Sequence, residues 1–595
     1  MGISMYVGLL ALYCVSSFVR DTVQHEDFTY LHRFSRSVDT PIPRECQMSS
    51  WSDWSQCFPC LGSKFRYRNL AQPAKFGGGI CAGNLWELIA CKSSQKCAPE
   101  SNCGNDFRCK ESGRCIKRDL VCNGEPDCRD WSDENDCEQM EHQTFCQQYQ
   151  LDPIPGAQHV VQGFNVLTQD DTQPVLDHNY FGGHCEYIYN GEWRDLRYDP
   201  ICERMYYNDE EKYYRKPYNF QVYQFLSRAE TTMSFELYED SNEVLRATGT
   251  HSSFDFGFTL GVRPTGVPLG IKGGLNFGTK SDFLKNISSY TAKNLQFVRL
   301  VTTVQTARFR MRRSNLMLNE DMLIALSELP DTYNYGLYAR FIGDYGTHFV
   351  TSGIVGGTLE NVLVLDKDVM RRQEITFQMV ENCFGGELGL TLAIPESPIE
   401  GTVGIKGKKC KKFEEETDDV TGKESVIKDV ITFVKGGDAA WAGGISNVFD
   451  GTTYRFWGRS LKYSPAVIEY ELLPIYEALK LVDVSGIETK RQNLKRAYDE
   501  FLGEFNPCRC GPCQNNGGPT MDDNRCSCQC PSGYGGLACE QTERPAKEAH
   551  GQWSCWSSWS GCQSGTRQRS RSCNNPPPKS GGNPCLGKST QKEFC

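Results

Sequence analysis

Cysteine is the residue type that most constrains this chain. Twelve of its thirty cysteines lie within residues 46–137 and twelve within residues 508–595, with only five between these segments. Segments this short cannot bury a sufficient hydrophobic core, so they must be small modules held together by disulfide bonds. Such bonds persist in an oxidising compartment, which predicts an extracellular protein with disulfide-rich ends around a core-forming middle.

The N-terminal segment predicts export from the cell. The apolar run over residues 5–19 has the length of a signal-peptide core and is too short to cross a bilayer as a helix, so we expect residues 1–20 to be removed. Residues 33–36 have the R-x-x-R form that a secretory convertase recognises, so residues 21–36 are either a propeptide or a solvated basic patch. No other apolar run approaches about 18 residues, which predicts a chain without a helical membrane anchor.

The sequence argues against two classes of function. The net charge of −10 and the lack of a basic stripe interleaved with aromatic residues disfavour nucleic acid as a partner. His348, in a Gly-Thr-His turn, most suggests an enzyme, but no acid and nucleophile stand at a matching spacing. HExxH, GxSxG, P-loop and dinucleotide motifs are also missing. We therefore interpret His348 as a hydrogen-bonded structural residue and expect no enzymatic activity.

Two segments, residues 45–98 and 550–595, share a W-x-x-W pattern, which begins at Trp51 in the first of them. Both resemble thrombospondin type-1 repeats. In that family the tryptophans stack between arginines of neighbouring strands, and Arg66 and Arg68 are the expected partners here. The alternative is that these are ordinary core tryptophans. The resemblance also implies C-linked mannose on Trp51, Trp553 and Trp556.

Residues 102–138 combine six cysteines with a dense run of oxygen donors and resemble an LDL-receptor class A module. Oxygen donors packed this densely form a site for a hard cation, and the resemblance implies calcium as the cofactor. Two departures from the family pattern predict a lowered affinity: Asn123 stands where Asp is usual, and Trp131 where Gly is usual. The alternative is a solvated acidic loop. The implied ligands are the side chains of Asn123, Asp127, Asp133 and Glu134 and the backbone carbonyls of Leu120 and Glu125.

The last two modules each hold an odd number of cysteines. Residues 508–540 contain seven cysteines and a glycine-rich turn, and they resemble a compact EGF-like module. The thrombospondin-like repeat that follows contains five. Two odd numbers favour one bridge between the modules, and the resemblance implies that Cys508 pairs with Cys555. The tail would then be one rigid unit.

The middle of the chain, residues 139–507, has the composition of a mixed α/β domain. Apolar residues recur at helical spacing between Ile487 and Phe505, which predicts a helix there. A similar spacing predicts a second helix between Val426 and Val434. Strand-like alternation occurs elsewhere, so helices and strands share this domain.

The most specific motif of the middle domain runs from Tyr338 to Phe349 and ends in Tyr-Gly-Thr-His-Phe. Together with Trp457-Gly-Arg-Ser-Leu-Lys and the glycine pairs at 356–357 and 443–444, it resembles the membrane attack complex/perforin family. The resemblance implies a multidomain protein whose α+β central domain has a bent antiparallel sheet and helical clusters, flanked by small disulfide-rich modules. It also implies that two clusters unfurl into membrane hairpins while glycines near the bend let the sheet open.

Two regions, near residues 250–280 and 385–407, carry an apolar face of period two. Their arms have about the 9–11 residues that a membrane strand needs, and a closed sheet satisfies its backbone hydrogen bonds in lipid. We therefore predict two transmembrane hairpins. The alternative is a half-buried antiparallel sheet that never meets lipid. The side chains predicted to enter the membrane are Phe254, Phe256, Phe258, Leu260, Val262, Leu269, Ile271, Leu388, Leu390, Leu392, Ile394, Val403 and Ile405.

Asn286 begins the glycosylation sequon Asn-Ile-Ser beside the first of these regions. A glycan there would have to stay outside the bilayer. A non-lytic adhesion protein is a third class of function, because thrombospondin, LDL-receptor and EGF-like modules all serve in matrix binding. The two amphipathic regions and the 338–349 motif favour a pore-forming protein instead.

The order of modules resembles that of complement component eight chains. Without Cys14 the chain keeps 29 cysteines, and pairing Cys146 with Cys185 and Cys383 with Cys410 leaves Cys202 over. The surroundings of Cys202 resemble an insertion that is disulfide-linked to a lipocalin-like gamma chain, whereas a beta-type chain is the alternative.

The partners follow from the same resemblance. It implies the beta and gamma chains of complement component eight, the earlier terminal complement components, component nine and the target-cell membrane. The protein would be secreted and would reach the target-cell membrane after complex assembly, where a sheet edge would serve as the template for the next subunit.

Overall fold

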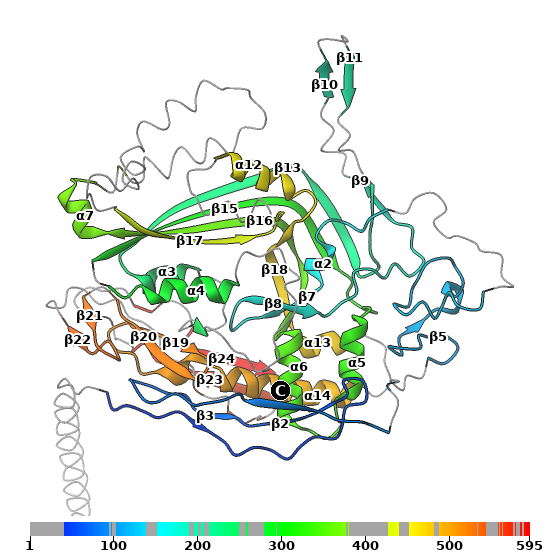
Figure 1. The fold of residues 1–595 in the computed structure, drawn as a ribbon, viewed down its shortest axis with the longest axis horizontal. Coiled ribbons are helices and arrows are strands. Elements are labelled where there is room, and N and C mark those ends of the chain that lie inside the picture. Colours follow the sequence, from blue (N-terminus) through cyan, green and yellow to red (C-terminus); the bar gives the residue numbers. More distant parts are fainter. Residues whose placement is uncertain are drawn as a thin grey trace, which may run out of the picture.

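The structure is a computed structural model of the chain (Figure 1). It describes residues 41–94, 97, 103–137, 151–189, 196–199, 204–207, 213–248, 258–259, 279–292, 294–376, 379, 426–438, 451–480, 487–531, 533–542 and parts of 557–594. The predicted signal peptide and propeptide, Cys202 and most of both predicted hairpin regions lie outside these ranges.

Seven strands form the central sheet, and three of them are long (Figure 1). These three run antiparallel in the order β13-β15-β16, while β17 and β18 pair with different halves of β16. Buried and partly exposed residues alternate along much of β15, as expected when successive side chains point to opposite faces. The α+β prediction is confirmed. The strands are β7 (Gln162–Asn165), β8 (Asp170–Pro174), β13 (Phe220–Tyr238), β15 (Leu295–Met311), β16 (His348–Asp366), β17 (Ile427–Lys435) and β18 (Ala466–Pro474).

Four helices close the largest core at one end of this sheet (Figure 1). Tyr338, Phe349 and Phe501 are fully buried there. Asn334 begins one of the helices, because its side chain accepts a hydrogen bond from the N–H of Leu337. The helices are α5 (Glu320–Glu328), α6 (Tyr335–Tyr345), α13 (Ile475–Lys480) and α14 (Ile487–Glu504). The helix predicted between Ile487 and Phe505 is thus confirmed as α14.

The helix predicted between Val426 and Val434 is wrong, because this segment is strand β17. It pairs with β16 along most of its length, from Lys435 opposite Thr358 to Ile427 opposite Leu365. Its valines and isoleucines occur at positions that fit both a helical and a strand period. The available sheet edge and the preference of β-branched residues for strands decided between the two.

The small modules are held together by the disulfides that their cysteine counts require. The thrombospondin-like repeat contains β1 (Gln47–Met48), β2 (Ser63–Tyr67), β3 (Leu70–Gln72) and β4 (Trp86–Ala90); the class A module contains β5 (Phe107–Arg108) and β6 (Cys115–Ile116); and the tail contains β19 (Gly518–Asp522), β20 (Arg525–Gln529), β21 (Tyr534–Gly535), β22 (Gln541–Thr542), β23 (Thr566–Ser570) and β24 (Thr590–Phe594). The bonds are Cys46–Cys81, Cys57–Cys91, Cys60–Cys97, Cys103–Cys115, Cys109–Cys128, Cys122–Cys137, Cys510–Cys526, Cys513–Cys528, Cys530–Cys539 and Cys573–Cys585. Cys508 is also disulfide-bonded. The other six cysteines of the EGF-like module pair among themselves. The partner of Cys508 therefore lies outside the EGF-like module.

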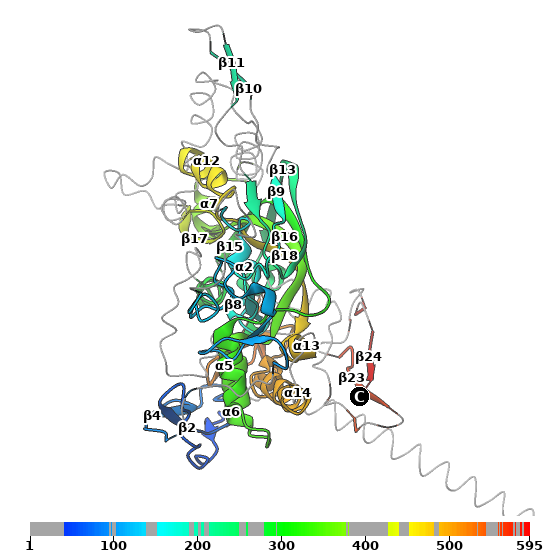
Figure 2. The same ribbon diagram turned by 90° about the vertical axis from the view of Figure 1, so that its right-hand side faces the viewer.

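An insertion leaves the central domain between β9 (Tyr187–Tyr189) and β12 (Tyr213–Arg215), which pair with each other at its root. Between them β10 (Leu196–Asp199) and β11 (Arg204–Tyr207) form an antiparallel hairpin that projects away from the body (Figures 1 and 2). The hairpin brackets Cys202, which itself lies outside the described residues.

Candidate membrane-inserting region and metal site

Both connections that carry the predicted hairpins leave the sheet at the same end. β13 ends at Tyr238 and β16 ends at Asp366, beside Phe297 and Leu295 of β15. β17 begins at Ile427, next to the end of β16. Strands grown from either connection would therefore extend the sheet in one direction.

The first connection forms two helices, α3 (Ser241–Thr248) and α4 (Lys280–Ser289), which pack against the sheet (Figure 1). Their buried residues Leu245, Phe283 and Ile287 form one cluster with Phe297 and Phe433 of the strands. The second connection begins with α7 (Lys367–Arg372). Among the described residues, no helix is both long and apolar enough to cross a membrane.

A buried ion cluster attaches α4 to the sheet. Glu360 of β16, only 2% exposed, accepts from Lys280 Nζ at 2.5 Å and from Arg299 Nε at 2.6 Å. Burial by itself would raise the pKa of Glu360, but the two cations outweigh it and lower that pKa. Arg299 also pairs with Glu236 at 2.7 Å. If α4 left the sheet, Glu360 would keep Arg299 as its counter-ion.

The EGF-like module contacts this first connection at several points. Asn242 and Arg246 of α3 both donate to the carbonyl of Asn516, at 3.1 and 2.7 Å. Lys285 of α4 pairs with Asp522 at 2.7 Å. The first connection is therefore bound both to the sheet and to a neighbouring module.

Phe258 is the one predicted membrane-inserting residue within the described part of the chain. It lies in β14 (Phe258–Thr259), which pairs in parallel with β19 of the EGF-like module, opposite Thr520. In this form Phe258 and Thr259 add a strand to the small sheet of the EGF-like module. The other predicted residues lie outside the described ranges: Phe254, Phe256, Leu260, Val262, Leu269, Ile271, Leu388, Leu390, Leu392, Ile394, Val403 and Ile405.

The Tyr338–Phe349 motif is structural. The Tyr338 hydroxyl donates to the carbonyl of Pro330 at 2.8 Å inside the main core. His348 is buried, with Nδ1 2.9 Å from Thr347 Oγ1 and Nε2 3.2 Å from the Tyr498 hydroxyl. Burial lowers the pKa of His348 to about 4, so its ring is neutral. These contacts support the structural interpretation of His348.

The Trp457 motif packs against the glycine pair at positions 356–357. Trp457 is fully buried in α12 (Gly451–Ser460) and donates from Nε1 to the carbonyl of Gly436 at 2.8 Å. A Cβ at Gly357 would lie 2.8 Å from the indole, and one at Gly356 would lie 1.9 Å from the carbonyl of Val304. Only glycine at these two positions of β16 allows α12 and β15 to approach β16 this closely.

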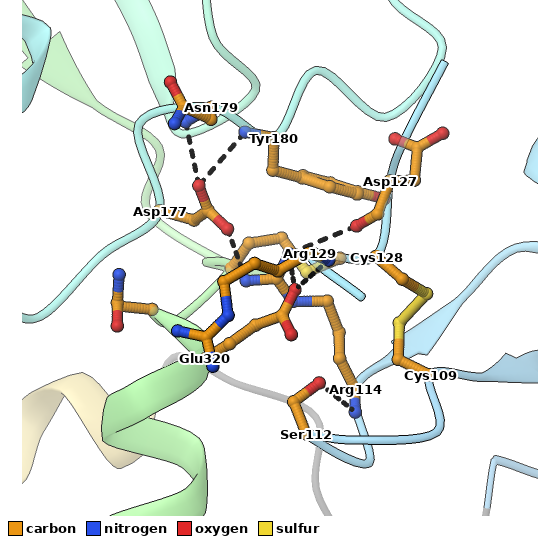
Figure 3. A network of polar contacts seen from close by, with 12 residues as sticks. Cys109, Ser112, Arg114, Asp127, Cys128, Arg129, Asp177, Asn179, Tyr180 and Glu320 are labelled. Carbon is orange, nitrogen blue, oxygen red and sulfur yellow. Dashed lines mark hydrogen bonds and ion pairs between the residues drawn. A yellow bond between two sulfur atoms is a disulfide. The ribbon is translucent and has the colours of Figure 1, made fainter. Parts of the chain in front are cut away.

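The class A module docks on the central domain through a buried arginine (Figure 3). The Arg114 guanidinium, 3% exposed, pairs with Asp177 and, at 3.1 Å, with Glu320. It also donates to the carbonyl of Leu318 at 2.8 Å. Arg129 adds a partly exposed ion pair with Asp321 at 2.6 Å. Buried charges are tolerated only when paired, so these contacts fix the orientation of the module.

The predicted calcium ligands lie together in one loop, although their side chains do not all point to one centre. Burial raises the pKa of Asp127 to about 7 and also raises that of Asp133, whose buried Oδ1 has no hydrogen-bond partner. Both features fit a site that a cation would complete. Glu134, however, accepts from the backbone N–H groups of Asn123 and Gly124. Among the described residues no three acidic, His or Cys side chains converge closely enough to form a metal site as they stand.

The remaining predicted ligands serve the same loop. Asn123 donates from Nδ2 to Asp127 at 3.0 Å, and its Oδ1 accepts from the N–H of Glu125 at 2.8 Å. Leu120 is buried in the module core. Trp131 is 58% exposed with φ of 57°, a left-handed conformation that explains why glycine is usual at this position.

Family models match most of the chain. The MAC/Perforin domain matches residues 154–511, more than half of the sequence. This chain belongs to the MAC/Perforin family. The class A domain of the low-density lipoprotein receptor matches residues 101–137, an EGF-like domain of complement components matches 513–541, and the thrombospondin type 1 domain matches 49–97 and 551–595.

Two relatives of this MAC/Perforin chain come from Oryctolagus cuniculus. It is 48% identical to the complement component C8 alpha chain, over 93% of this chain and 94% of the relative. It is 33% identical to the complement component C8 beta chain, over 95% of this chain and 92% of that relative. The prediction that it resembles the alpha chain of complement component eight more than the beta chain is confirmed. A solved structure, GNIP1Aa from Chromobacterium piscinae, is 16% identical with a TM-score of 0.34 over 60% of this chain and 57% of that one, and this score carries no argument.

The tryptophan ladder of the MAC/Perforin chain's first thrombospondin repeat is present as predicted. The Trp51 ring lies between Arg66 and Arg68, whose guanidinium carbons are 4.7 and 4.5 Å from its centroid. Arg66 also lies 4.9 Å from the ring of Trp54. Trp553 and Trp556 lie outside the described residues.

Sequence reasoning missed the charged residues that join different parts of the MAC/Perforin chain. Arg114, Lys280 and Glu360 stand in no local motif, and their partners are far away in the sequence. The one usable signal was a charged residue inside an apolar strand pattern, as at Glu360 between Leu359 and Val362.

Proposed function

We propose that this chain is a subunit of the terminal complement membrane attack complex and acts by inserting two β-hairpins into a target membrane. The observation that carries the proposal is the pair of connections at one end of the MAC/Perforin sheet. Each holds a period-two apolar region of transmembrane length, and each could lengthen two adjacent strands. The identity with a complement C8 alpha chain over nearly the whole chain supports the complement setting.

The partners proposed are the beta and gamma chains of complement component eight, the earlier terminal components and component nine. The protein would be secreted and would act at the target-cell membrane. Its contribution is mechanical: a MAC/Perforin sheet edge pairs with a neighbouring subunit while the hairpins close the barrel in lipid.

Liposome leakage tests this function. Terminal complement components are added stepwise, with this chain and its partner chains either included or withheld. We expect leakage only when the chain is present. Equal leakage without it contradicts the proposal, and adhesion to liposomes or matrix without leakage favours the adhesive alternative.

Cys202 is proposed to form the disulfide to the gamma-type chain. In support of this assignment, β10 and β11, the strands that flank position 202 in the sequence, form a hairpin that projects from the body (Figure 2). In Cys202→Ser we expect a non-reducing gel to show the partner chain released, with secretion unchanged. A disulfide within this chain at Cys202, found by peptide mapping, would contradict the assignment.

Calcium is proposed as the cation of the class A module. Asp127, Asp133 and Glu134 would hold it, together with Asn123 and the carbonyls of Leu120 and Glu125. The ion would neutralise carboxylates that the fold has buried and so stabilise the docked loop.

Calcium titration of the secreted chain tests this site. We expect calorimetry after chelator dialysis to show one ion bound, and Asp133→Asn to abolish binding. At about one hundred times the Kd, calcium should stabilise the module by about 2.7 kcal/mol. Asp130→Asn is the matched control, since Asp130 caps a neighbouring turn through Ser132. If the module unfolds at the same temperature in calcium and in chelator, the proposed calcium site is contradicted.

Glycosylation is proposed at two kinds of site. Asn286 is exposed on α4, while its neighbours Leu284 and Ile287 are buried, so a glycan would point into solvent. C-linked mannose would be carried by Trp51 of the tryptophan ladder and, by resemblance, by Trp553 and Trp556. A glycan at Asn286 would also require the membrane-crossing part of the first hairpin to end before this residue.

A further inference from the structure

Arg215 anchors the root of the insertion. It is the last residue of β12 and pairs with Tyr187, the first residue of β9. Its Nε and one terminal nitrogen donate to the carbonyl of His184, both at 3.1 Å, and its guanidinium carbon lies 4.1 Å from the Phe181 ring centroid. The Arg215 side chain thus ties the end of β12 to the segment that leads into β9.

The counter-ion of Arg215 comes from the class A module. Both carboxylate oxygens of Glu125 accept from the Arg215 guanidinium, at 2.7 and 2.8 Å. The Arg215 side chain is 8% exposed and that of Glu125 is 24% exposed, so water screens the pair weakly. Charge-assisted, bidentate pairs of this kind combine strength with a fixed geometry.

A second contact of the same loop reinforces the first. The backbone N–H of Gly182 lies close enough to the carboxylate of Asp127, two residues beyond Glu125, to act to lower its pKa. Gly182 lies in the segment that leads to β9, where Tyr180 contacts the class A module core. The loop therefore holds this segment on one side and Arg215 on the other.

Loss of the Glu125 charge would leave Arg215 buried beside carbonyl groups without a full counter-charge. Breaking a buried pair by removing one partner is much more disruptive than losing an exposed pair. We expect the structure to respond by local opening, in which β9 and β12 separate and water reaches the guanidinium. The root of the insertion would open while the core of the central domain stayed closed.

We propose that Glu125 and Arg215 are positioning residues through which the class A module sets the orientation of the insertion and hence the presentation of Cys202 to a partner chain. The part that concerns a partner chain rests on the proposed function. The part that concerns the root of the insertion does not.

Calcium would act on the same loop. Glu125 is one of the residues whose backbone carbonyl is an implied ligand, and Asp127 is an implied side-chain ligand. An ion held there would fix the backbone at Glu125 and so keep its carboxylate directed at Arg215. Chelation should then loosen the root of the insertion in the same direction as a change at Glu125.

Hydrogen exchange of the secreted full chain, followed by mass spectrometry, tests the proposal. In Glu125→Gln we expect peptides covering residues 181–189 and 213–218 to exchange at least about tenfold faster, the size expected from losing a buried charge-assisted contact. Glu125→Asp, which keeps the charge on a shorter side chain, should give a smaller increase. Peptides of β15 and β16 should not change in either variant.

Asp321→Asn is the control, because it removes a different ion pair between the class A module and the central domain, that of Arg129 with Asp321. We expect it to leave residues 181–189 and 213–218 unchanged. Unchanged exchange in Glu125→Gln, or an equal increase in Asp321→Asn, overturns the proposal.

The yield of interchain disulfide separates this inference from the proposed function. If the wild-type chain forms the disulfide and Glu125→Gln forms clearly less of it, both stand. If the wild-type chain forms none but exchange still rises at the root, the Cys202 assignment fails and the positioning role survives. Normal disulfide yield together with unchanged exchange in Glu125→Gln means that the positioning role is wrong.

Discussion

Replacing Trp457 by Ala is expected to destabilise the MAC/Perforin domain by about 3–5 kcal/mol. The indole is fully buried, contacts Leu461 and Gly357, and uses its N–H on the carbonyl of Gly436. Its loss would leave a cavity over the glycine pair of β16 that the backbone cannot fill without giving up strand pairing. Calorimetry of the secreted chain should show a lower transition temperature for this domain.

Phe456→Ala provides the control on the same helix. Phe456 is 37% exposed, so its removal should change the stability by no more than about 1 kcal/mol. Equal effects of the two changes would mean that burial over the glycine pair does not stabilise the domain. A selective effect of Trp457→Ala would show that α12 is packed against the sheet in solution.

Placing an arginine at Leu390 is expected to reduce lysis by the assembled complex severely, whereas an arginine at Thr391 should leave most of it. A charged side chain on the lipid face costs about 2–4 kcal/mol near the bilayer midplane, while a barrel-lumen position tolerates it. The measurement is lysis at equal amounts of membrane-bound complex, with secretion and partner binding checked first.

The same pair of changes at Phe258 and Thr259 is a weaker comparison. Both residues pair with the EGF-like strand β19 in the soluble form, so an arginine at either could also disturb that contact. Leu390 and Thr391 lie outside the described residues. Equal loss of lysis at both of these positions, or no loss at either, would mean that the segment does not cross the membrane in the predicted register.

The modules could be predicted from the sequence because their determinants are local. The cysteine spacing of 46–137 and the tryptophans near Trp51 specify small folds whose residues are close in sequence. The structure confirms the Arg66 and Arg68 stacking and the helix that begins at Ile487. In each case a short pattern contained the whole physical reason.

The remaining features could not be predicted because they depend on residues far apart in the chain. Valines and isoleucines at 426–434 fit two periods, and only the neighbouring edge of β16 makes the segment a strand. Glu360 needs Lys280 from another element, and Arg215 needs Glu125 from another module. Neither pair has a sequence signature, because nothing in either local segment indicates its partner.

Attachment of a fluorophore at successive positions from 388 to 394, read with a quencher carried on lipid chains, tests membrane insertion most directly. In the assembled complex we predict quenching that alternates residue by residue, strong at Leu388, Leu390 and Leu392 and weak at the positions between them, with no quenching before assembly. Uniform quenching, or none after lysis has occurred, would contradict insertion of this segment as a transmembrane β-hairpin.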